Sequence, residues 1–171
     1  GHRDFSEDTY RVLTAVDSVI MVLDVASGVE EQTRKLMEVC RLRDIPIITF
    51  VNKLDRFGLP PLEILSDIEE TLALETVPLS WPIGMGDRFR GTYNLYEDEL
   101  HLFSHADMQG EHERLAIDSL SDERLDDILG EQADELRFDI ELVREAGDSL
   151  NLERYRDGIQ TPVFFGSALS N

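Results

Sequence analysis

The chain has little of several things that mark particular classes of protein. It has one cysteine, Cys40, in 171 residues, so no disulfide can form within the chain. The longest apolar run near its start, Val19 to Leu23, stops at Asp24 and is far too short to cross a bilayer. The residues before that run do not have the pattern of a signal peptide, so we expect none. These absences argue against a disulfide-stapled or membrane-spanning domain, and we expect a cytoplasmic protein.

Basic residues are also scarce. The chain has 16 Lys and Arg against 36 Asp and Glu, a formal net charge of −20. Such a chain is repelled by bare phosphates, so we expect no direct binding to DNA or RNA. The stretch from Glu111 to Asp157 alone holds 16 acidic and six basic residues. That excess indicates either solvated helix faces or an acidic surface for a basic partner.

The first half of the sequence has the patterns of alternating helices and strands. A short polar helix is predicted at Ser6–Ala15 and buried strands at Ser18–Asp24 and Ile45–Val51, both continuous apolar runs. Apolar spacing predicts helices at Glu30–Arg43, in which Cys40 is a buried small hydrophobe, and at Pro61–Leu74. Alternating strands and helices favour an α/β fold with a parallel sheet and right-handed crossovers.

The character of the chain changes after Val77. Trp81–Gly91 is rich in glycine and turn signals, and two short strands around 92–95 and 100–103 are predicted to pair as a hairpin or meander. One acidic helix is predicted over Ser121–Ala146 and a short one over 151–156, before a buried strand at Thr161–Gly166. We therefore expect one domain, 1–171, with a subdomain inserted at about 82–158.

Two polar loops directly follow buried strands, where ligands of open α/β folds bind. Asn52–Asp55 follows the strand at 45–51, and Gly166–Leu169 follows the apolar run at 163–165. An Asn-Lys-x-Asp loop can read guanine, because the Asp55 carboxylate accepts hydrogen bonds from the ring N–H and the exocyclic amine. Adenine offers neither group there, so it would leave the carboxylate unpaired.

The neighbouring residues can complete such a site. The stem of Lys53 can lie along the face of the base, and the amide of Asn52 can tie the loop to its neighbours. A backbone N–H of the loop containing Ser167 and Ala168 can reach the guanine carbonyl oxygen. A simple polar turn at a strand end is the alternative reading. No metal ligand is predicted.

Taken with these motifs, the chain resembles the GTP-binding domain of the translational GTPases from their second conserved loop onward. Gly1-His2 is similar to the end of an Asp-x-Pro-Gly-His motif, although read alone it could be a cloning remnant. Within that superfamily the likeness is greatest to the peptide chain release factor 3 family. It is carried by the segments 4–11, 36–44, 52–56, 81–86 and 161–169. Arg3 departs from the acidic residue expected there.

The resemblance implies a P-loop-NTPase-like parallel sheet with helices on both faces, here incomplete, and an acidic insertion with short antiparallel strands and helices. It implies that His2 is catalytic and orients the attacking water, while Gly1 offers its N–H to the γ-phosphate. The implied nucleotide-binding residues are Gly1, Asn52, Lys53, Asp55, Ser167, Ala168 and Leu169. In the family the complete protein binds GTP or GDP with Mg²⁺ and acts on the ribosome, where it removes a class I release factor.

The sequence contains no Gly-x-x-x-x-Gly-Lys-Ser/Thr segment, whose backbone N–H groups cradle phosphates. We therefore expect a fragment that neither hydrolyses GTP nor holds a nucleotide tightly, with an exposed sheet edge beside 18–24 at which two copies could pair. An elongation factor G-like translocase or a ribosomal protection protein is one alternative identity. A nucleotide-free interaction module is an alternative of another class.

Overall fold

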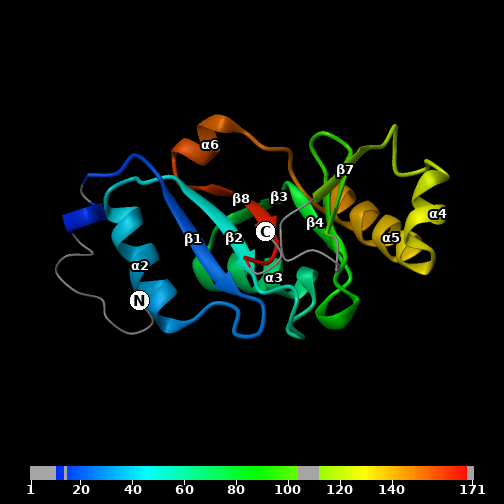
Figure 1. Ribbon diagram of the computed structural model, residues 1–171. Helices are drawn as coiled ribbons and strands as arrows, with labels where there is room; N and C mark the ends of the chain where they lie inside the picture. The colour runs from blue at the N-terminus through cyan, green and yellow to red at the C-terminus, as the bar shows by residue number, and fades with distance from the viewer. Residues whose placement is uncertain (1–10, 14, 104–111, 169–171) are drawn as a thin grey trace.

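A parallel sheet of four strands, three from the first half of the chain and one from its end, is the centre of the computed structural model, which describes residues 11–13, 15–103 and 112–168. Its strand order is β1-β2-β8-β3 (Figure 1). The strands are β1 (Val19–Asp24), β2 (Ile47–Asn52), β8 (Gln160–Phe165) and β3 (Glu75–Pro78). The predicted α/β fold with a parallel sheet is confirmed.

Two amphipathic helices cover one face of this sheet. Helices α2 (Glu31–Leu42) and α3 (Pro61–Leu72) contact each other, and their apolar residues share one core with alternate residues of β1 and β2. Pro61 begins α3 at the first helical position, where a missing N–H costs nothing. Cys40 is buried in this core, as predicted, whereas Leu42 at the end of α2 is exposed because it lies on the other side of the helix. Of the predicted first helix, only residues 11–13 are described as helical.

The opposite face of the sheet is apolar and partly open to solvent. Ile20, Val22 and Phe164 are 64%, 59% and 37% exposed, because strand residues alternate between the two faces and none of the described helices covers these positions. Strand β1 is an edge strand in the described sheet. Pairing of two copies at that edge stays a prediction.

Strand β3 is an addition that the sequence patterns did not predict. The chain leaves α3 through Ala73, whose φ of 50° turns it back, and the four residues of β3 then pair in parallel with β8. The short helix α6 (Leu152–Arg156) lies beside this edge, and its Arg154 forms an ion pair with Glu75. The predicted helix at 151–156 is confirmed, with the Asn151 side chain capping its first turn.

A second sheet, entirely antiparallel, is built from the next part of the chain. Its order is β4-β5-β6-β7, with β4 (Ser80–Ile83), β5 (Gly91–Asn94), β6 (Glu99–Phe103) and β7 (His112–Ala116). The predicted hairpin is present as β5 and β6. The turn signals noted over Trp81–Gly91 apply to its middle, around the short 3₁₀ helix Gly86–Arg88, while residues 81–83 belong to β4, a strand that was not predicted.

Trp81 joins the second sheet to the first. Its ring is 1% exposed and packs edge-on against Phe165 of β8, with ring centroids 5.4 Å apart. One residue earlier, the Ser80 hydroxyl accepts the backbone N–H of Phe165 at 2.9 Å. An apolar contact and a buried hydrogen bond therefore fix how the inserted elements sit on the parallel sheet.

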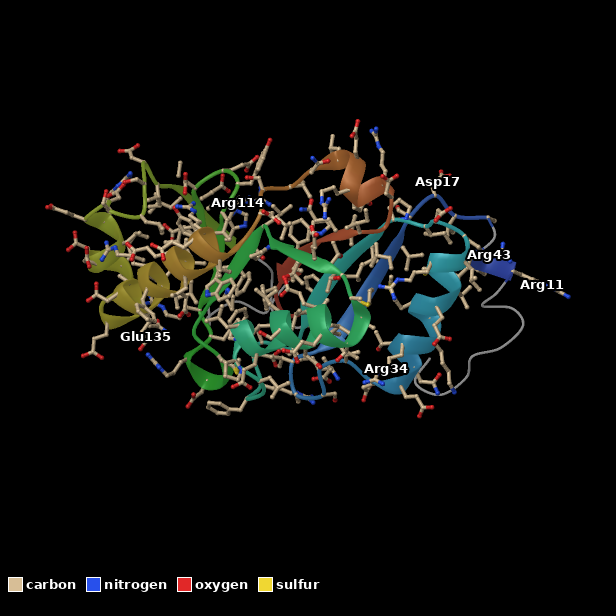
Figure 2. The ribbon with its side chains drawn as sticks, turned by 180° about the vertical axis from the view of Figure 1, so that it is seen from behind. Arg11, Asp17, Arg34, Arg43, Arg114 and Glu135 are labelled. Atoms are coloured by element: carbon tan, nitrogen blue, oxygen red, sulfur yellow. The ribbon has the colours of Figure 1, made fainter. Side chains whose placement is uncertain are left out.

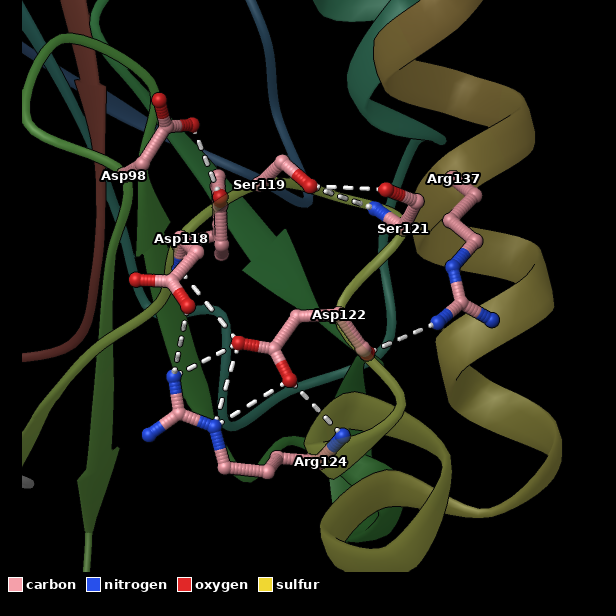
Figure 3. Close-up of polar contacts among 8 residues, drawn as sticks. Asp98, Asp118, Ser119, Ser121, Asp122, Arg124 and Arg137 are labelled. Atoms are coloured by element: carbon pink, nitrogen blue, oxygen red, sulfur yellow. Dashed lines mark hydrogen bonds and ion pairs between the residues drawn. The ribbon is translucent and has the colours of Figure 1, made fainter.

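The single helix predicted over Ser121–Ala146 is two helices. Helix α4 (Arg124–Leu129) ends at Gly130, whose φ of +58° breaks the helical path, and α5 (Glu131–Ala146) follows at once. Figure 3 shows the polar contacts that hold the start of α4 against α5. Asp122 accepts the backbone N–H and the guanidinium of Arg124, and Arg137 of α5 donates to the Asp122 carbonyl. The paired guanidinium lowers the pKa of Asp122.

The elements from β4 to α5 together form what we term the inserted unit. The predicted insertion boundaries at about 82 and 158 stay a prediction. In the described part of the chain, no helix combines the length and apolar character needed to span a membrane.

Candidate nucleotide-binding site

Three neighbouring strands of the parallel sheet end at the same edge, and the predicted polar residues lie there. Asp24 ends β1 and stands in register with Asn52, which ends β2. Gly166 follows β8, the next strand of the sheet. Because parallel strands share a direction, the loops that follow them meet at the carboxyl edge of the sheet.

The Asn52–Asp55 loop and the Gly166–Ala168 loop are linked by side chains at two points. The Asn52 amide oxygen accepts the backbone N–H of Ala168 at 3.0 Å. The Ser167 hydroxyl donates to one carboxylate oxygen of Asp55. Four of the residues predicted for the site are thus brought together, although 116 and 112 positions separate the two linked pairs in sequence.

Backbone contacts fix the first loop still further. Leu54, the unspecified residue of the motif, has no exposed surface and belongs to the main core. Its N–H donates to the Gly166 carbonyl at 3.2 Å, and its own carbonyl accepts the N–H of Gly86 at 2.9 Å. The loop is therefore anchored from two sides while Asp55 remains partly exposed beside it.

Lys53 has an ionic partner that the sequence patterns did not reveal. Its ammonium donates to the Asp24 carboxylate at 2.8 Å, and the other oxygen of Asp24 accepts the N–H of Ala26 at 2.9 Å. The bond from Lys53 is the main reason that the pKa of Asp24 is lowered. Lys53 itself has a φ of +67°, a left-handed conformation that is rare for residues with a side chain.

Asp24 could have been found from the sequence. It ends a buried strand that was predicted to neighbour the strand of the motif, and carboxylates at such strand ends lie beside the same site. Sequence reasoning used Asp24 only as the stop of an apolar run. With its ammonium held by Asp24, the stem of Lys53 has a fixed end, which suits it to form a wall for a planar base.

The loop pair offers a specific set of groups to a ligand. Asp55 can accept two adjacent N–H groups, and the backbone around Ala168 can supply an N–H to a carbonyl oxygen. Guanine carries this combination of donors and acceptor on one edge, whereas adenine does not. A site of this composition could discriminate guanine from adenine by hydrogen-bond pairing, and the contact with Ser167 restrains the Asp55 carboxylate.

Three of the predicted site residues, Gly1, His2 and Leu169, lie outside the described residues. Within the described ranges no group of three or more His, Cys, Asp or Glu side chains could hold a metal ion.

Comparison with known protein families finds a match over the whole chain. All residues, 1–171, match the family described as the elongation factor Tu GTP binding domain. The chain belongs to this family. Proteins of the elongation factor Tu GTP binding domain family are GTPases, and in general they bind GTP or GDP together with Mg²⁺.

A solved structure shows the same fold as this GTP binding domain. The crystal structure of a protein from Thermus thermophilus matches it with a TM-score of 0.67 at 20% sequence identity. The match covers 98% of this chain but 26% of that one, so this GTP binding domain spans about a quarter of the length of the matched chain. At this identity the likeness establishes the fold and nothing finer.

Proposed function

We propose that this chain reads the guanine base in the GTP-binding domain of a ribosome-dependent translational GTPase. The observation that carries the proposal is the double link between the two loops, Asn52 to Ala168 and Asp55 to Ser167. In this proposal Asp55 accepts two hydrogen bonds from guanine, and the stem of Lys53 lies against the base. Ser167 and Ala168 complete the pocket.

The release factor 3 type is the member that we propose, on the strength of the segments that resemble that family. The complete protein then uses GTP to remove a class I release factor from the terminated ribosome in the cytoplasm. Gly1 contacts the γ-phosphate and His2 orients the attacking water, a positioning role that suits phosphoryl transfer.

Nucleotide affinity of this chain by itself is proposed to be weak. Apart from Gly1 and His2, the residues proposed for the site contact the base, whereas backbone N–H groups and a lysine of a phosphate loop supply much of the affinity of such domains. A fluorescent GDP titration of this chain beside the full-length protein that carries it tests the point. Equal affinity of the two would contradict it.

The base-reading role is tested by changing what Asp55 can accept. In the full-length protein we expect Asp55→Asn to lose GDP affinity by roughly 100-fold or more, since the charged acceptor becomes a neutral amide whose N–H groups face the exocyclic amine of guanine. The amide N–H of the variant can donate to the extra carbonyl oxygen of xanthine, so binding of xanthosine diphosphate should rise. Competitive titration with GDP, ADP and xanthosine diphosphate measures all three affinities.

Asp127→Asn is the matched control, because Asp127 is an exposed aspartate on α4, away from both loops. Its GDP affinity should equal that of the wild type. The proposal is wrong if wild-type protein binds ADP as well as GDP, or if Asp55→Asn leaves the preference unchanged.

The release factor 3 identity needs a separate measurement, because the alternative ribosomal GTPases would share the same base preference. We expect the full-length protein with GTP to release a bound class I factor from terminated ribosomes. Movement of the ribosome along its message, or rescue of tetracycline-stalled ribosomes, would instead favour the translocase or the protection protein.

A further inference from the structure

The guanine-reading loop lies against the first turn of the inserted unit. This turn, called the support turn, runs from Gly84 to Arg88. The N–H of Gly86 donates to the Leu54 carbonyl at 2.9 Å. Since Leu54 is fully buried and immediately precedes Asp55, a shift of the support turn acts on the backbone that carries the proposed base-reading carboxylate.

Two more contacts continue this support along the loop. The ring of Phe57 lies directly on Gly86, so closely that a Cβ added to Gly86 would stand 2.7 Å from the ring. The N–H of Gly58 points to the sulfur of Met85 at 3.2 Å. The loop therefore meets the support turn at Leu54, Phe57 and Gly58, with Asp55 between the first two contacts.

The support turn is itself held by the rest of the inserted unit. Gln132 of α5 donates to the Arg88 carbonyl at 2.9 Å, and Arg88 pairs with Glu135 at 3.2 Å. Gly84 allows the tight path, because its φ is +73° and an added Cβ would lie 2.2 Å from the Arg88 carbonyl oxygen. Contacts thus run without a break from α5 through the support turn to Leu54.

We propose that the support turn is a positioning element for Asp55, so that discrimination of guanine depends on the inserted unit. This inference rests on the proposed function. Two hydrogen bonds from one planar base demand that the carboxylate be placed to within a fraction of an ångström. The main chain of Leu54 is held by Gly166 on one side and by Gly86 on the other, and loss of the second contact leaves Asp55 less well placed.

The ratio of GDP affinity to inosine diphosphate affinity reports this placement. Inosine diphosphate lacks the exocyclic amine and makes one of the two hydrogen bonds to Asp55, while its phosphates are the same. A lower fraction of folded protein, or weaker phosphate binding, changes both affinities equally and leaves the ratio unchanged. A displaced carboxylate lowers the ratio.

Three left-handed glycines of the inserted unit provide matched variants for the full-length protein. Gly84, Gly86 and Gly130 have φ values of +73°, +64° and +58°, so alanine is similarly strained at each. Gly84→Ala clashes with backbone and should lower the ratio roughly tenfold, toward equal binding of the two nucleotides. Gly86→Ala should lower it less, because the ring of Phe57 is 71% exposed and can swing aside. Gly130→Ala has nothing within 4 Å of the added Cβ and should leave the ratio unchanged.

Phe57→Ala covers the case in which Gly84→Ala does not fold. The Phe57 ring is mostly exposed, so its loss costs little stability but removes a contact with the support turn. We expect the ratio to fall about threefold, whereas Tyr96→Ala, which removes an exposed ring from the inserted unit away from the support turn, should not change it.

An unchanged ratio in both Phe57→Ala and the folded glycine variants would overturn the positioning role and leave the proposed function standing. A wild-type protein that binds GDP no better than inosine diphosphate would instead show that Asp55 does not read the exocyclic amine, and the proposed function itself would fail.

Discussion

The ammonium of Lys53 is held on the Asp24 carboxylate, so these two residues are expected to act as a unit. Asp24→Asn removes the charge but keeps an oxygen that can accept the Ala26 N–H. We expect this variant to bind GDP about fivefold more weakly, the effect of one partly exposed ion pair. The ratio of GDP to inosine diphosphate affinity should not change, because in the proposed site Lys53 lies against the face of the base and not its edge.

A double-mutant cycle measures whether Asp24 acts through Lys53. If it does, Asp24→Asn has no further effect once Lys53 is methionine. Glu75→Gln is the control, since Glu75 forms a similarly exposed ion pair with Arg154 at a distance from the site.

The pKa of Asp24 is lowered in the folded protein. The Asp24–Lys53 pair therefore stabilises the fold above the usual carboxyl pKa of 3.8, and this stabilisation is lost as the pH falls below it.

Helix α5 bears a carboxylate that is costly to keep charged. Asp139 accepts the indole N–H of Trp81 at 3.3 Å, and its burial beside the second sheet raises its pKa. A raised pKa means that the folded state loses stability as the pH rises from 3.8 through the folded value. Asp139→Asn keeps an acceptor for Trp81 without a charge.

At pH 7 we expect Asp139→Asn to raise the melting temperature by about 1 to 3 °C. The gain should disappear below the usual pKa of the carboxyl group, where wild-type Asp139 is protonated as well. Thermal melts followed by circular dichroism from about pH 3 to 8 measure it, with exposed Asp127→Asn as the control. If Asp139→Asn melts at a lower temperature than the wild type at neutral pH, the charge of Asp139 is needed for its hydrogen bond to Trp81.

The elements predictable from sequence are those with a strong period or a continuous apolar run. The strands at 18–24 and 45–51 and the helix at 61–74 were predicted to within about two residues, because burial imposes their patterns. Strands β3 and β4 are four residues each and contain proline, so their sequences carry little strand signal. The break at Gly130 was missed because apolar spacing continues across it in α5.

The two loops of the site were predictable for a similar reason, since each follows a buried run. The contacts that other parts of the chain make with these loops were not predictable. The contacts of Asp24 and Gly86 with the loop depend on which strands are neighbours and on where the inserted unit folds back, and one sequence does not carry that information.

At the scale of the whole molecule, negative charge dominates. Figure 2 shows Arg11, Arg34, Arg43 and Asp17 at the end that holds α2, and Arg114 and Glu135 toward the end that holds the inserted unit. A net charge of −20 destabilises a compact state through self-repulsion, and salt screens that repulsion. We expect the melting temperature to rise by about 3 °C or more between roughly 10 and 200 mM NaCl, as the Debye length shortens from about 30 to about 7 Å.

Removing exposed negative charges from the inserted unit should reduce this salt effect. Glu123→Gln, Glu141→Gln and Glu145→Gln together change three exposed residues, and the triple variant should melt higher than the wild type at about 10 mM NaCl. An equal salt effect in both proteins would mean that the repulsion lies elsewhere in the chain.

The third position of the Asn-Lys-x-Asp motif is unspecified, yet in this fold it is the most constrained of the four positions by burial and backbone hydrogen bonds. Leu54 is sealed in the core, and its main chain is engaged on both sides. A design that transfers the motif to another parallel sheet must therefore also provide a buried apolar site and backbone partners for its third residue. Without that buried site, Asn52, Lys53 and Asp55 would keep their order in the sequence but would not be held in the positions that the site requires.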